Sequence, residues 1–262
     1  MSIPENTSKN THNVVMRLLE ENLSVKRTDT PAAPEDNAEK LCSPLCGARI
    51  LDIPCGAGAF TDRLLRAKAE VHSADIENIL QIQAGNFSQA DMNDTLPYDD
   101  EFFDAIVCID GIEHLEKPTD FIRETVRTLS PGGTLILSTP NISSLRSRSR
   151  FLFTGHHNKC KTPLDESNPG PLHHISMFTF PEIRYMLHTN SIKIDKIVTN
   201  RIKVASFPYM LLVPFAWLAT KASYSKNEKD RGCRKTNREI FRQLFSGPVL
   251  LGETLIVSAR KA

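Results

Sequence analysis

The feature that most constrains this chain is a series of short apolar segments that alternate with helical segments between residues 48 and 138. Strands buried in a parallel sheet have this continuous apolar character, because helices cover both faces of such a sheet. Alternation of strands and helices along a chain is typical of the α/β class. We therefore predict an α/β protein with a doubly wound, mostly parallel sheet.

Seven segments have the length and composition of strands, at residues 49–53, 71–74, 86–90, 103–109, 134–138, 192–198 and 254–259. Helices are predicted where apolar side chains recur every three or four positions, at residues 60–67, 119–129 and 181–188. A long segment, residues 201–247, separates the last two predicted strands. The prediction is thus a seven-stranded sheet with an insertion before its last strand.

The N-terminal part, residues 1–46, is predicted to be a helix followed by a linker. The helix is indicated by one apolar face and a predicted cap at Thr11, the face being formed by Val14, Val15, Leu18 and Leu19. Residues 28–37 contain two prolines and mixed charges, which is typical of a linker. Residues 47–262 are predicted to form the main domain, including the insertion.

The net charge of +1 conceals an uneven distribution. From residue 201 to the end there are twelve basic and four acidic residues, whereas residues 1–200 hold twenty basic and twenty-seven acidic ones. An acidic body with a basic C-terminal part argues against a protein that coats nucleic acid, and favours a locally basic surface.

The first thirteen residues are polar and lack the basic-then-apolar pattern of an export signal, so a cytoplasmic location is expected. The six cysteines are scattered along the chain without the paired spacing of a zinc site. Their distribution indicates a reducing compartment and predicts no metal.

A predicted strand, a glycine turn and a helix start follow one another in residues 52–60. Gly56 and Gly58 allow a ligand to approach backbone amides at the start of that helix. Thr61 occupies the place of the third glycine of the dinucleotide fingerprint, which disfavours NAD. Asp52, just before the loop, suits a cationic ligand end and would repel a pyrophosphate.

Two further carboxylates end neighbouring predicted strands. Asp75 follows one strand and is placed to accept from ribose hydroxyls; Asp91 ends the next and is placed to accept from an adenine amino group, with Met92 covering the ring. Ligands of open α/β sheets bind outside the carboxyl ends of the strands, so these acids are expected to share one crevice. The alternative is that each aspartate only forms a turn.

The chain resembles the class I S-adenosylmethionine-dependent methyltransferases, and within them the ubiquinone-biosynthesis-like O-methyltransferase branch. The resemblance is carried, in order along the chain, by residues 50–60, Asp75, Asp91, and residues 96–97, 103–104, 113–115, 129–133 and 138–141. It implies a Rossmann-like methyltransferase fold and S-adenosyl-L-methionine as the cofactor.

Residue roles follow from this resemblance. It implies that the methionine end is held by Asp52, Gly56 and Gly58, the ribose by Asp75, the adenine by Asp91 and Met92, and the sulfonium side by Ile109 and Asp110. In two places the sequence departs from the family pattern. Only fifteen residues separate Asp75 from Asp91, so the helix usual between those strands is short or missing, and Pro54 replaces a usual glycine.

On the acceptor side, His114 is the candidate general base, because a neutral imidazole near pH 7 can take a hydroxyl proton. Glu113 beside it would orient the histidine or bind a metal. The alternative is that His114 caps a turn or packs under the cofactor. His173 and His174 are within reach of the crevice mouth, but paired histidines are more often plain loop residues.

Residues 142–153 place three arginines beside an apolar patch, which would suit either an anionic acceptor or an amphipathic helix over the site. In the insertion, residues 204–220 carry no charge over seventeen positions and include Trp217. As a helix this run is about 25 Å long, shorter than the roughly 30 Å hydrocarbon core, and two prolines interrupt it. Eight basic and three acidic residues follow in residues 221–242.

An apolar run beside a basic run suits peripheral contact with an anionic membrane through residues 204–242; the alternatives are a lid and a dimer contact.

Together these features predict a cytoplasmic methyltransferase, peripheral at the membrane, that methylates oxygen on a small or lipid-linked acceptor. One alternative is an RNA methyltransferase, although residues 109–112 lack the tetrad of base-amino methylation. The other is an inactive cofactor-binding partner of a membrane-associated biosynthetic complex.

Overall fold

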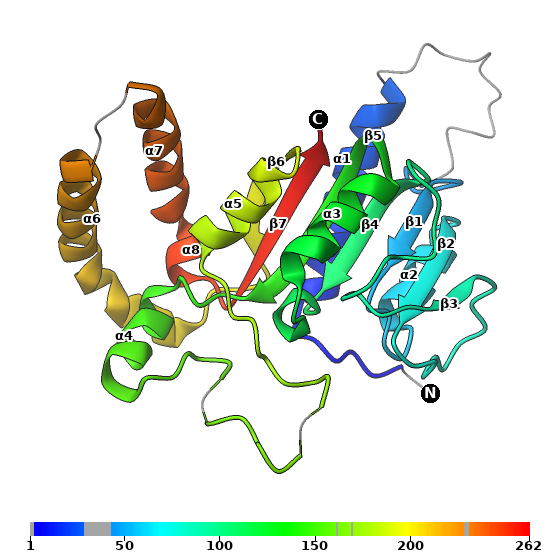
Figure 1. Ribbon diagram of the computed structural model, residues 1–262, viewed down its shortest axis with the longest axis horizontal. Coiled ribbons are helices and arrows are strands. Elements are labelled where there is room, and N and C mark those ends of the chain that lie inside the picture. Colours follow the sequence, from blue (N-terminus) through cyan, green and yellow to red (C-terminus); the bar gives the residue numbers. More distant parts are fainter. Residues whose placement is uncertain (1–2, 29–42, 161, 169, 228–230) are drawn as a thin grey trace.

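The computed structural model describes residues 3–28, 43–160, 162–168, 170–227 and 231–262 (Figure 1). The predicted linker at residues 28–37 lies, apart from its first residue, outside the described residues. The described part is built around one sheet with helices on both faces.

The sheet contains β1 (Arg49–Asp52), β2 (Glu70–Asp75), β3 (Phe87–Gln89), β4 (Phe103–Ile109), β5 (Leu129–Pro140), β6 (Ile192–Thr199) and β7 (Thr254–Lys261). Their order across the sheet is β3-β2-β1-β4-β5-β7-β6 among the described residues. Strands β1 to β5 pair in parallel, whereas β7 runs antiparallel to both β5 and β6. The predicted doubly wound, mostly parallel sheet is confirmed.

The described helices are α1 (Thr11–Thr28), α2 (Ala59–Arg66), α3 (Pro118–Thr128), α4 (Leu145–Thr154), α5 (Phe180–Thr189), α6 (Val213–Asn227), α7 (Arg231–Leu244) and α8 (Gly247–Leu251), with 3₁₀ turns η2 (Ile112–His114) and η3 (Val204–Leu212). Helices α3 and α5 pack on one face of the sheet, and α1 and α2 pack on the other (Figure 1). Each face therefore has its own apolar core.

Helix α1 packs on the sheet through its predicted apolar face. Val15 and Leu19 are fully buried in the core that contains Ile50 of β1 and Phe60 of α2. Thr11 is the first residue of α1, whereas a capping residue precedes the helix, so the predicted cap at Thr11 is wrong. Its hydroxyl donates to the Ser8 carbonyl at 2.7 Å. Helix α1 thus contributes to the same core as the strands.

The connection from β2 to β3 contains no helix in residues 76–86, which are all described. This confirms the prediction that the helix usual at this position is short or missing. The loop instead lies against the glycine turn, because the amide of Gln81 donates to the Ala57 carbonyl at 3.1 Å.

The cysteines only partly match the expectation of a reducing compartment. Cys55 and Cys108 are buried free thiols and Cys160 is also free. Cys46 is disulfide-bonded, which the predicted reducing compartment does not anticipate.

The insertion forms η3, α6 and α7, which lead into α8 before β7. Figure 1 shows α6 and α7 standing away from the sheet, beyond β6 and α5. Pro208 lies inside η3, and Pro214 is the second residue of α6, where a helix tolerates proline.

Candidate active site

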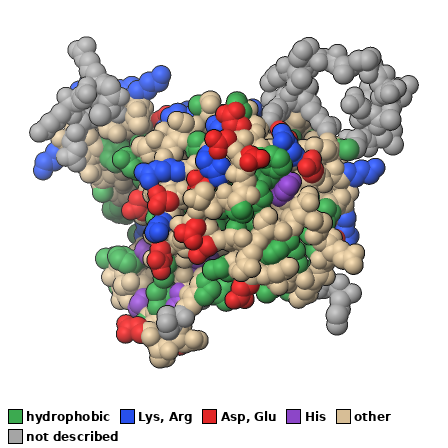
Figure 2. Space-filling model, turned by 45° about the vertical axis from the view of Figure 1, so that its right-hand side comes forward, with side chains coloured by type: hydrophobic (Ala, Val, Ile, Leu, Met, Phe, Trp, Pro, Cys, Tyr) green, Lys and Arg blue, Asp and Glu red, His purple; other side chains and the backbone are tan. Residues whose placement is uncertain are grey.

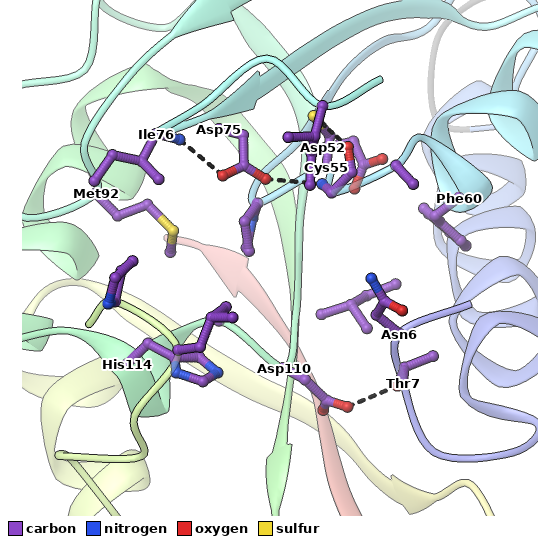
Figure 3. Close-up of a pocket in the computed structure, with 18 of the residues that line it drawn as sticks. Asn6, Thr7, Asp52, Cys55, Phe60, Asp75, Ile76, Met92, Asp110 and His114 are labelled. Carbon is purple, nitrogen blue, oxygen red and sulfur yellow. Dashed lines mark hydrogen bonds between the residues drawn. The ribbon is translucent and has the colours of Figure 1, made fainter. Parts of the chain in front are cut away.

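A cavity of about 290 Å³ opens at the carboxyl ends of β1, β2 and β4 (Figure 3). Every site residue predicted from the sequence except Gly58 lines it: Asp52, Gly56, Asp75, Asp91, Met92, Ile109, Asp110 and His114. Asp52 and Asp75 lie at one end of the view in Figure 3, and Asp110 and His114 at the other. The three strand-end aspartates therefore do share one crevice.

Asp52, the last residue of β1, is 1% exposed and accepts a hydrogen bond from the Thr61 hydroxyl at 2.6 Å. Burial raises the pKa of Asp52 to about 7, although the hydrogen bond from Thr61 acts in the opposite direction. A cationic group bound beside this carboxyl would favour its ionised form. The position therefore fits the charged end of a cationic ligand.

The glycine turn has two residues in left-handed backbone conformations, with φ of +52° at Gly56 and +89° at Gly58. A Cβ at Gly56 would meet no protein atom within 4 Å, so the space beside Gly56, which lines the cavity, is open to a ligand. A Cβ at Gly58 would lie 2.9 Å from side-chain carbons of Leu80 and Ile82. Gly58 therefore shapes the turn from behind the cavity wall, and its contact with a ligand stays a prediction.

The carboxylate of Asp75 is fixed by two backbone amides (Figure 3). One oxygen accepts from the Gly56 amide and the other from the Ile76 amide, both at 2.8 Å. A carboxylate oxygen can accept a second hydrogen bond, so each retains capacity for a ligand hydroxyl. Asp75 thus ties the glycine turn to the end of β2 and faces the cavity.

Asp91 and Met92 reach the same cavity although the preceding connection has no helix. One oxygen of Asp91 accepts from the backbone amide and the side-chain amide of Asn93, at 2.8 and 3.0 Å. Met92 is 7% exposed and forms part of the apolar core. The short connection therefore keeps both residues in the cavity wall, and their contact with adenine stays a prediction.

Asp110 connects β4 to the N-terminal segment. Its carboxylate accepts from the hydroxyls of Thr7 at 2.6 Å and Ser138 at 2.7 Å. Further N-terminal residues complete this wall of the cavity, namely Pro4, Asn6 and His12. The sequence offers no signal for this wall, because residues 3–10 are mostly polar and carry no periodicity.

His114 lies in η2, with its Nδ1 atom 3.1 Å from the carbonyl oxygen of His173. Because a carbonyl only accepts, Nδ1 carries the proton and Nε2 is the basic nitrogen. Burial lowers the pKa of His114 below its usual range, so the imidazole is neutral at pH 7. These properties are those required of a general base.

The ring of His174 meets the ring of His114 edge-on, with their centroids 4.7 Å apart. Together with the hydrogen bond to the His173 carbonyl, this contact places the histidine pair at the site, so the interpretation of the pair as plain loop residues is wrong.

Glu113 is fully buried, and burial together with the nearby Asp110 carboxylate raises its pKa to about 8. One ligand atom from each of Glu113, His114 and His174 lies within 4.8 Å of the others, a spacing compatible with a cation.

Comparison with known proteins matches residues 51–137 to a family model described as a methyltransferase domain. The chain is also 33% identical over 110 residues to a ubiquinone biosynthesis O-methyltransferase from Xanthomonas oryzae pv. oryzae. It is 34% identical over 116 residues to a demethylmenaquinone methyltransferase from Clavibacter sepedonicus. This chain carries a class I, S-adenosylmethionine-dependent methyltransferase domain.

The matches to these relatives are partial. They include 37% of this chain and 45% of the Xanthomonas protein, and 40% of this chain and 47% of the Clavibacter protein. The chain thus spans less than half the length of the curated relatives it matches. The fold of this chain is also similar to that of a putative S-adenosylmethionine-dependent methyltransferase from Listeria monocytogenes, with a TM-score of 0.50, 10% identity, and coverage of 86% of this chain and 96% of that one.

The residues of the cavity fit the cofactor that the methyltransferase domain implies. The buried carboxyl of Asp52 suits the cationic methionine end, and the open space at Gly56 lets a ligand approach the backbone. Asp75 retains acceptor capacity for ribose hydroxyls, and Asp91 with Met92 offers an acceptor beside an apolar surface. S-Adenosylmethionine is therefore the cofactor that this cavity is suited to hold.

Proposed function

We propose that this protein is an S-adenosylmethionine-dependent methyltransferase that methylates oxygen on a small or lipid-linked acceptor. The observation that carries this proposal is the cavity itself. It combines the Asp52 carboxyl, the open glycine turn and the two strand-end carboxylates with a neutral histidine at the other end. The residues proposed to hold the methyl donor and the candidate base thus line one cavity.

The cofactor, when bound, supplies an activated methyl group attached to a sulfonium. The protein has to hold donor and acceptor in line and to keep water out. Asp52, Gly56 and Asp75 would fix the donor at one end of the cavity. Nε2 of His114 would take the proton of the acceptor hydroxyl as the new carbon–oxygen bond forms.

Support for an oxygen acceptor comes from the histidine and from the partial relatives. A hydroxyl benefits from a base, because its proton must leave during the transfer. The Xanthomonas relative is named as an O-methyltransferase of ubiquinone biosynthesis, and the Clavibacter relative is named for demethylmenaquinone. These names favour a small or lipid-linked acceptor over RNA.

The proposal is tested by incubating the full chain with S-adenosylmethionine labelled in its methyl group and a fractionated cell extract. We expect label in the small-molecule or lipid fraction, in a methyl ether that releases labelled methyl iodide when hydriodic acid cleaves its methyl–oxygen bond. Label in RNA would contradict the proposed acceptor. If the protein binds the cofactor but transfers no label to any fraction, the result would favour an inactive cofactor-binding partner.

Replacing Asp75 with alanine is expected to weaken cofactor binding by about 1–3 kcal/mol, because ribose hydroxyls lose a charged acceptor. Calorimetric titration measures this loss directly. Asp91→Ala tests the adenine side in the same way, and Asp99→Ala, at an exposed position outside the cavity, is the matched control. An Asp75→Ala protein that binds as tightly as the control would show that Asp75 only forms the turn.

A further inference from the structure

Three elements of the structure expose large apolar side chains that the rest of the described chain leaves uncovered. Leu152, Leu211 and Phe215 are 76%, 78% and 72% exposed. We call the whole set the α4–α6 surface, and it consists of Phe151, Leu152 and Phe153 on α4, Val204, Phe207, Met210, Leu211 and Leu212 on η3, and Phe215, Trp217 and Leu218 on α6. Contiguous apolar exposure of this kind marks an interaction site.

The elements of this surface are neighbours in space although they are distant in sequence. Helix α4 contacts η3, and η3 leads directly into α6. Tyr224 of α6 is close enough to Arg148 of α4 to affect its pKa. Figure 1 shows α4 beside the base of α6, on the side of the molecule away from β3.

The segments that form the α4–α6 surface carry basic residues and no acidic ones, and the nearby Glu253 is paired with Lys203 at 2.6 Å. Residues 142–164 and 202–227 contain no aspartate or glutamate, but α4 carries Arg146, Arg148 and Arg150, and α6 carries Lys221 and Lys226. By contrast, the face shown in Figure 2 has acidic and basic side chains side by side. A basic and apolar surface is complementary to an anionic lipid bilayer, since apolar side chains enter the headgroup boundary while lysine and arginine contact anionic headgroups.

The course of the chain favours lying on the membrane over crossing it. Residues 204–226 are long and apolar enough to cross, and only 6% of their most apolar window is buried. However, α7 packs against α6 and returns to the sheet, and Arg184 of α5 contacts Glu239 and Gln243 of α7 at 3.1 and 2.7 Å. A crossing η3–α6 segment would draw the charged α7 into the hydrocarbon, at a large cost.

A lid over the active site does not account for this surface. Among the described residues, none in 204–227 lines the candidate active-site cavity, and most of the large apolar side chains of η3 and α6 are exposed to solvent, although Trp217 also contacts the ring of Phe241 on α7. A lid would hold those side chains against the cavity mouth, which Pro171 and Leu172 help to line instead.

We propose that the α4–α6 surface docks this protein onto the surface of an anionic lipid bilayer. The apolar side chains of α4, η3 and α6 enter the headgroup boundary, and the arginines and lysines of α4 and α6 contact anionic headgroups. Docking requires neither cofactor nor methyl transfer, so its test succeeds or fails separately from that of the proposed function.

The chain contains one tryptophan, Trp217, which lies on the docking surface and reports on it directly. We expect its fluorescence to shift to the blue, and to be quenched by brominated lipid, when the full chain meets phosphatidylcholine vesicles containing phosphatidylglycerol. Vesicles of phosphatidylcholine alone should have little effect. High salt should weaken the response, because salt screens the attraction between exposed charges.

A matched pair of variants locates the contact. Leu218→Ser should lower the vesicle affinity by about tenfold to a hundredfold, because serine has much less apolar surface than leucine to transfer from water into the bilayer. Leu65→Ser, the same change at an exposed position on α2, should leave it unchanged. An unchanged Trp217 spectrum with anionic vesicles at low salt, or equal losses in both variants, would overturn the proposal. Self-association of the chain that Leu218→Ser abolishes, without vesicle binding, would assign the surface to a second copy instead.

Discussion

Replacing His114 with alanine is expected to lower turnover by about 10²–10⁴-fold while cofactor affinity stays nearly unchanged. The neutral ring has its proton on Nδ1, facing the His173 carbonyl at 3.1 Å, and so presents Nε2 as the base. His114→Asn retains a hydrogen-bond donor but has no basic nitrogen, and should lose as much turnover. His156→Ala, outside the cavity lining, is the control.

Steady-state kinetics with the identified acceptor, together with cofactor titrations, separate the possible roles of His114. Lost cofactor affinity with unchanged turnover at saturation would make it a packing residue. If a chelator reproduces the loss of turnover in the unmodified protein, the group formed with Glu113 and His174 holds a cation, and the role as base is contradicted.

Replacing Gly58 with valine is expected to abolish cofactor binding. A residue with a β-branched side chain is strongly disfavoured at a φ of +89°, and its Cβ would lie 2.9 Å from Leu80 and Ile82. The glycine turn, whose Gly56 amide is bonded to Asp75, would therefore be displaced. Calorimetric titration with S-adenosylmethionine measures the loss.

Gly85→Val is the matched control, because a Cβ at Gly85 would meet no atom within 4 Å. Circular dichroism shows whether each variant folds. If Gly58→Val does not fold, Gly56→Ala tests the same turn, since its methyl group would enter open space beside the cavity. Undiminished binding by folded Gly58→Val would contradict the assignment of the cavity to the cofactor.

Much of the fold could be predicted because its signals are local. Strands β4, β5 and β7 contain continuous apolar runs, and each predicted strand overlaps an observed one. Asp52, Asp75 and Asp91 could be placed in one crevice from topology alone, because the carboxyl ends of parallel strands meet at one edge of the sheet. That the helix before β3 is short or missing also followed from the spacing, since fifteen residues leave little room for one.

The remaining parts of the site depend on contacts between distant residues. The hydrogen bond from Thr7 to Asp110 joins positions 103 residues apart, and the contact of His114 with the His173 carbonyl joins positions 59 apart. Neither segment has a periodic pattern that would indicate its partner. The same reason explains why the N-terminal wall of the cavity was not predicted.

The most direct test of the central claim is calorimetric titration of the full chain with S-adenosylmethionine and, in parallel, with NAD. The structure predicts saturable binding of S-adenosylmethionine with one site per chain, and no binding of NAD, because Asp52 would repel a pyrophosphate at the glycine turn. Binding of NAD in place of S-adenosylmethionine, or no binding of either, would contradict the account.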